Sequence, residues 1–157
     1  MGEIEQWKGI YREAVQLCDA VKRLPEACPC SDARAHLEER CRCCGEAPRP
    51  GSRIAAETCQ ETLGRLRADV AILCEDFKLS AGALEQGLRG EPGAPVRRGI
   101  LLAAADLQQV ASELDHAGEA VLGFLHTCSI EQMQRLKRHA AALREHCERV
   151  NTALLQQ

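Results

Sequence analysis

The C-terminal segment, residues 130–154, constrains the fold more strongly than any other part of the chain. Apolar or small residues recur in it at intervals of three and four: Ile130, Met133, Leu136, Ala140, Leu143, Cys147, Val150 and Leu154. This spacing places all eight side chains on one face of a helix. Neither proline nor glycine interrupts the segment. A helix of about 25 residues is about 38 Å long, and its apolar face needs other helices to cover it.

The remaining residues of this segment are consistent with one long surface helix. The face opposite the apolar stripe carries polar residues: Gln134, Lys137, Arg138, Arg144, Glu145, Glu148 and Arg149. Ser129 is a suitable N-cap, because its hydroxyl can accept a hydrogen bond from the backbone N–H of Gln132. We therefore expect the helix to begin next to Ser129.

Three further segments have the same amphipathic pattern. They are predicted as helices from Glu3 to Leu24, from Arg53 to about Phe77, and from Pro95 to about His116. Their apolar stripes are Ile4, Trp7, Tyr11, Ala14, Cys18, Val21 and Leu24; Ile54, Thr58, Leu63, Leu66, Val70, Leu73 and Phe77; and Val96, Ile100, Leu107, Val110 and Leu114. Aromatic residues form only 3% of the chain, so the core consists mainly of small and aliphatic side chains that suit helix packing.

Glycine, proline and serine divide the rest of the chain. Two short helices are predicted, Ala33–Cys44 and Glu119–Leu125, the second separated from the preceding helix by Gly118. Loops are expected near residues 45–52 and 87–94, and a break near residues 80–82. The prediction is an all-α fold: an antiparallel bundle of four long helices plus two short ones, forming a single domain over residues 1–157.

Composition excludes several functional classes. The 20 basic and 23 acidic residues are interspersed, whereas a nucleic-acid-binding domain shows a basic stripe with stacking aromatic residues. The longest apolar run, residues 100–105, is much shorter than the roughly 20 residues of a membrane span. The N-terminal residues match neither a secretory signal nor a myristoylation pattern. These patterns predict a cytoplasmic protein that binds no nucleic acid and does not span a membrane.

The ten cysteines are expected to be reduced, because disulfides are rare in the cytoplasm. Cys18, Cys74 and Cys147 lie on apolar helix faces, where a thiol behaves as a small hydrophobic group. Five others are close together in the sequence: Cys28, Cys30, Cys41, Cys43 and Cys44. Thiolates bind zinc or copper(I), but these spacings differ from those of a zinc ribbon. We expect free thiols and no metal ligand here, and a zinc or copper site is the alternative.

No catalytic pattern is recognisable. The histidines are His36, His116, His126, His139 and His146. His139 and His146 are two helical turns apart, too far to chelate one ion by themselves. Cys128 near His126 would suit a reactive thiol at a helix N-terminus, but the sequence shows no oxyanion or substrate pocket to support catalysis there, and the adjacent Ser129 is explained by capping. The sequence also has no glycine-rich phosphate loop and no EF-hand calcium loop. It predicts a protein that is not an enzyme and holds no cofactor.

Charged residues gather in three places: Glu38–Arg42, Arg97–Arg98 and Arg135–Arg149. The simplest interpretation is that they form solvated helix faces. The alternative is that one of these faces binds an acidic protein surface, such as that of a microtubule.

Four short strings support a family resemblance. They are AHLEERC at 35–41, LCEDF at 73–77, GAPV at 93–96 and VLGFLHTCSIE at 121–131. In these strings and in the order of its helices, the chain resembles the sperm acrosome-associated protein 9 family over roughly residues 4–150.

The resemblance implies a structural role. Members are similar to microtubule inner proteins, which are small bundles lining the lumen of axonemal microtubules in cilia and sperm flagella, and they are also associated with the acrosome. The expected partners are tubulin and other axonemal proteins, and the expected location is the cytoskeleton of the axoneme. The two alternatives are the cysteine-cluster metal protein and a general helical adaptor that binds partner helices in a groove.

Overall fold

The computed structural model describes the backbone of residues 2–24, 52–87, 95–127 and 130–155, and the side chains of residues 4–24, 54–77, 103–126 and 130–155. Four helices account for nearly all of these residues: α1 (Glu3–Arg23), α2 (Ser52–Gly87), α3 (Pro95–Thr127) and α4 (Ile130–Leu155). The described residues contain no strand. The predicted all-α fold with four long helices is therefore confirmed.

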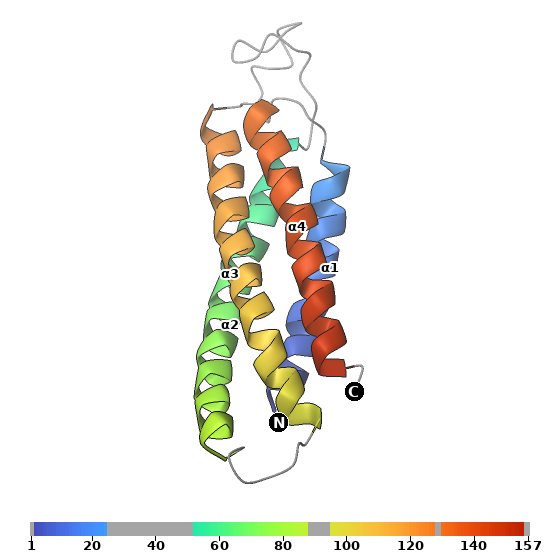
Figure 1. Ribbon diagram of the computed structural model, residues 1–157. Coiled ribbons are helices and arrows are strands. Elements are labelled where there is room, and N and C mark those ends of the chain that lie inside the picture. The colour runs from blue at the N-terminus through green and yellow to red at the C-terminus, as the bar shows by residue number, and fades with distance from the viewer. Residues whose placement is uncertain (1, 25–51, 88–94, 128–129, 156–157) are drawn as a thin grey trace, which may run out of the picture.

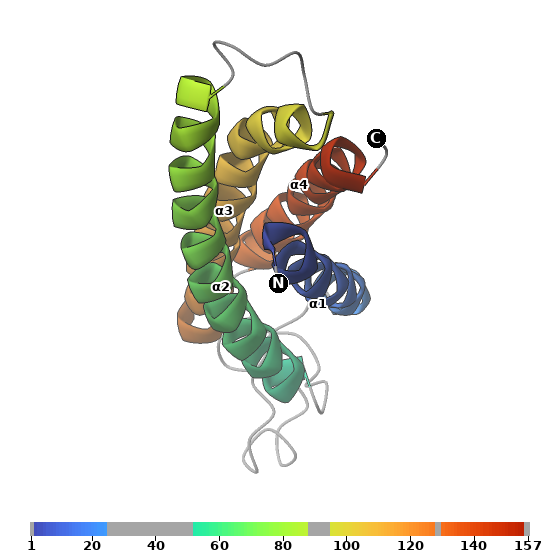
Figure 2. The same cartoon turned by 90° about the horizontal axis from the view of Figure 1, so that it is seen from below.

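The helices form an antiparallel bundle in which each helix contacts two neighbours (Figure 1). The contacts are α1 with α2, α2 with α3, α3 with α4, and α4 with α1. Seen from the end where α1 begins, α3 lies between α2 and α4, and α4 lies between α3 and α1 (Figure 2). The ring closes because the first and last helices pack together, and Trp7 Nε1 donates to Asn151 Oδ1 across this contact at 3.3 Å.

The core is built from the predicted stripes. In α4 every predicted core residue except Ile130, which is half-buried, is buried: Met133, Leu136, Ala140, Leu143, Cys147, Val150 and Leu154. They meet the buried faces of the other helices, which contribute the largest enclosed side chains, Trp7, Phe77 and Phe124. The three-four spacing thus identified this face of α4 correctly.

The predicted stripe of the second long helix was wrong at its beginning. Ile54 is 68% exposed and Thr58 is also exposed, whereas Ala56 and Cys59 are buried. The reason is angular: residues four and seven before Leu63 share its face, but a residue five positions away lies about 140° around the helix. In α1 the buried face is wider than the predicted stripe, because Ile10 and Leu17 are buried as well.

Two predicted interruptions are absent from the described helices. α2 continues through residues 80–82 to Gly87, and α3 runs without a break through Gly118, so residues 119–125 are not a separate short helix. A glycine inside a helix costs about 1 kcal/mol relative to alanine. Burial of Ala117, Ala120 and Val121 on either side of Gly118 outweighs that cost. The other predicted short helix, residues 33–44, lies outside the described residues, as do most of the two predicted loops and the Ser129 cap.

The end of α1 is stabilised by α4. Lys22 and Arg23 lie in its last turn, where positive charge interacts favourably with the helix dipole. The Lys137 ammonium donates to the carbonyl oxygens of Lys22 at 3.2 Å and Leu24 at 2.6 Å. These carbonyls lack partners within the helix, so a side chain from the far end of the sequence completes the C-terminus of α1.

Candidate functional site

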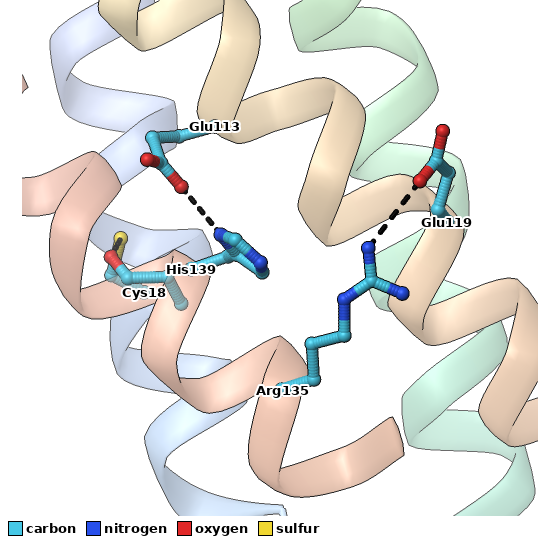
Figure 3. Close-up of polar contacts among 6 residues, drawn as sticks. Cys18, Glu113, Glu119, Arg135 and His139 are labelled. Atoms are coloured by element: carbon cyan, nitrogen blue, oxygen red, sulfur yellow. Dashed lines mark hydrogen bonds and ion pairs between the residues drawn. The ribbon is translucent and has the colours of Figure 1, made fainter. Parts of the chain in front are cut away.

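A row of carboxylates paired with basic side chains follows the contact between α3 and α4. In each pair α3 supplies a carboxylate and α4 a basic group: Glu119 with Arg135 at 3.5 Å, Glu113 with His139 at 2.6 Å, and Asp106 with His146 at 3.9 Å. The first two pairs are shown in Figure 3. From the second pair to the third, α3 steps back seven residues and α4 advances seven, as the antiparallel arrangement requires. The row therefore follows the register in which the two helices pack.

Three histidines, His116, His139 and His146, lie at the edge of this contact. The rings of His116 and His139 are stacked, with centroids 4.9 Å apart and planes inclined by 20°. The side chain of His139 is 25% exposed and that of its partner Glu113 is 17% exposed. His126 is exposed, and His146 is half-buried with no hydrogen bond to its Nδ1. Across the four described segments, no three His, Cys, Asp or Glu residues are arranged to hold a metal ion.

The described cysteines form no disulfide, and most are buried. Cys18, Cys59 and Cys147 are buried, and Cys74 is half-buried. Burial raises the pKa of Cys18 to about 11 and that of Cys147 to about 12. Such thiols are protonated at neutral pH and are poor nucleophiles. The five clustered cysteines (Cys28, Cys30, Cys41, Cys43 and Cys44) lie outside the described residues, as does Cys128, so metal binding there stays a prediction.

A groove of about 380 Å³ separates the outer surfaces of α1 and α4. Its apolar floor consists of four small side chains: Cys18, Val21, Ala140 and Ala141. Its rim consists of five charged side chains: Lys22, Lys137, Arg144, Glu145 and Glu148. Sequence reasoning missed this groove. The available signal was the occurrence of small residues on the two stripes that face each other, Cys18 on α1 and Ala140 on α4.

The predicted charged face of α4 divides into paired and unpaired groups. Arg144 binds Asp19 at 2.9 Å, and Arg135 binds Glu119. Arg138 and Arg149 are exposed and make no ion pair with the other described residues. At 100° per residue, eleven positions bring these two guanidinium groups within about 20° of the same direction, about 16 Å apart along the axis. They are available to an external partner.

Comparison with known proteins identifies no relative: no family model, no curated protein and no solved structure matches the chain. None of the described helices is both long and apolar enough to cross a membrane.

Proposed function

We propose that this protein is a non-enzymatic structural protein that binds tubulin inside the axonemal microtubules of cilia and sperm flagella. The observation that carries the proposal is the resemblance to the sperm acrosome-associated protein 9 family. Two of its strings, LCEDF at 73–77 and VLGFLHTCSIE at 121–131, include described core positions. Leu73, Phe77 and Phe124 are buried in the bundle, so the resemblance concerns residues that determine the shape of the protein.

A protein of this kind acts through its shape and outer surfaces. The proposed tubulin contact is the outer face of α4, because Arg138 and Arg149 are exposed there and unpaired among the described residues. Exposed guanidinium groups can bind the carboxylates of an acidic protein surface. Each contact is small, but repetition along a regular lattice increases the overall affinity through avidity.

The test is localisation of a tagged copy in ciliated cells. The wild-type protein is expected in the axoneme, and the double variant Arg138→Glu/Arg149→Glu is expected to leave it for the cytosol. Arg12→Glu/Arg65→Glu is a control with the same change of net charge on exposed positions of α1 and α2, and the ion pair that it removes, Arg65 with Glu13 at 3.9 Å, is largely exposed and contributes little to stability. All three proteins should unfold at similar temperatures. A wild-type protein that is diffuse throughout ciliated cells would overturn the proposal.

A further inference from the structure

The groove between α1 and α4 has an apolar floor that neither helix fills. Cys18 and Ala140 are buried, and the Cys18 thiol donates to the Ala140 carbonyl oxygen at 3.3 Å. Val21 and Ala141 complete the floor. Because these side chains are small, the two helices approach closely at the bottom while space remains above. Pockets that bind small molecules in helical bundles are concave, mainly apolar and of this size.

The two ends of the groove differ in charge. At one end, the Lys22 ammonium is exposed and has no acceptor among the described residues. Beside it, the Lys137 ammonium uses two of its three donors on the carbonyls of Lys22 and Leu24, so one donor remains.

At the opposite end lie Glu145 and Glu148, the latter accepting the Tyr11 hydroxyl at 2.6 Å. Between the ends, Arg144 is held by Asp19. The distance from Lys137 to Glu148 along the axis of α4 is about 16 Å.

From this arrangement we infer that the groove binds a medium-chain fatty acid. The carboxylate lies between Lys22 and Lys137, and the hydrocarbon chain covers Cys18, Val21 and the two alanines. The glutamates repel a carboxylate from the other end, so the ligand takes a single orientation. This binding activity goes beyond the proposed tubulin contact, and the two arginines assigned to that contact do not line the groove.

The first test is calorimetry of the 157-residue protein with dodecanoate. The dodecanoate is kept at concentrations at which it forms no micelles. Ala141→Leu places a larger side chain in the groove, at a position where the wild-type residue is exposed. We expect its affinity to be at least tenfold lower than that of the wild type. Ala71→Leu makes the same change at an exposed position of α2 and should leave binding unchanged. No binding to the wild type, or equal binding by Ala141→Leu, would overturn the inference.

The second test measures separately how much the hydrocarbon chain and the carboxylate of the ligand contribute to affinity. Since a buried methylene contributes about 0.8 kcal/mol, each one added between octanoate and dodecanoate should increase affinity about fourfold. Lys22→Glu should weaken dodecanoate binding at least tenfold and leave dodecanol binding unchanged. If the wild type binds dodecanol as tightly as dodecanoate, the assignment of a carboxylate ligand is wrong.

Discussion

Replacing Leu136 by alanine tests the assignment of the two faces of α4. Leu136 is completely buried, and removal of a buried leucine side chain costs about 2–5 kcal/mol through lost transfer energy and the cavity that remains. Because the core residue one turn further along α4, Ala140, is small and cannot expand to fill the space, we expect about 3 kcal/mol. For a domain of this size this lowers Tm by about 6–12 °C.

The assay is urea and thermal unfolding followed by circular dichroism. Leu122→Ala on α3 is the matched control, because the wild-type leucine is 42% exposed and its truncation should cost less than about 1 kcal/mol. Leu136→Asp should leave the protein unfolded, since it buries an unpaired carboxylate, whereas Arg138→Glu should retain the wild-type Tm. If the variants at 122 and 136 are destabilised equally, or if Leu136→Asp folds normally, the packing described for α4 is wrong.

Three further predictions concern polar groups that connect the helices. Lys137→Met should destabilise the bundle by about 1–2 kcal/mol in urea unfolding, because two carbonyls at the end of α1 lose a charged donor; an equal effect of Arg138→Met would contradict this role. A double-mutant cycle of Glu113→Gln and His139→Gln should give a coupling energy of about 1 kcal/mol at neutral pH, and additive losses would show that the half-buried pair does not stabilise the fold. The folded-state pKa values of Cys18 and Cys147 are raised to about 11 and 12, so folded protein retains protons that unfolded thiols lose above about pH 9. Their contribution to stability is therefore complete below that pH and declines between pH 9 and 12 by up to about 1.4 kcal/mol per pH unit for each thiol. In the Cys18→Ala/Cys147→Ala variant, this decline should be visibly flatter in unfolding measured across that range, and an unchanged slope would contradict the assigned cause.

The sequence predicted the long helices well because each carries a continuous apolar stripe. Along α4, the spacing of three and four residues defines a single apolar face, so the individual buried residues could be identified from the sequence. The start of α2 is different because two sets of residues before Leu63 could continue its buried face. One set is Thr58 and Ile54, and the other is Cys59 and Ala56. Isoleucine is more hydrophobic than alanine, so the local pattern alone favoured the set with Ile54, which is wrong. The position of α3, which contacts α2, decides which side of α2 is enclosed.

The helix breaks and the candidate sites likewise depend on tertiary contacts that the local sequence does not show. Gly118 has a low intrinsic helix propensity, but the packing of Ala117 and Val121 on either side keeps α3 continuous, and this energy comes from other helices. The amphipathic periodicity, the all-helical class and the exposed arginines Arg138 and Arg149 were determined by the sequence itself. The α3/α4 ion pairs and the α1/α4 groove depend on which helices become neighbours and in what register. The α3/α4 pairs join residues 16 to 40 positions apart, and the groove joins residues more than a hundred positions apart, so only the tertiary structure could bring them together.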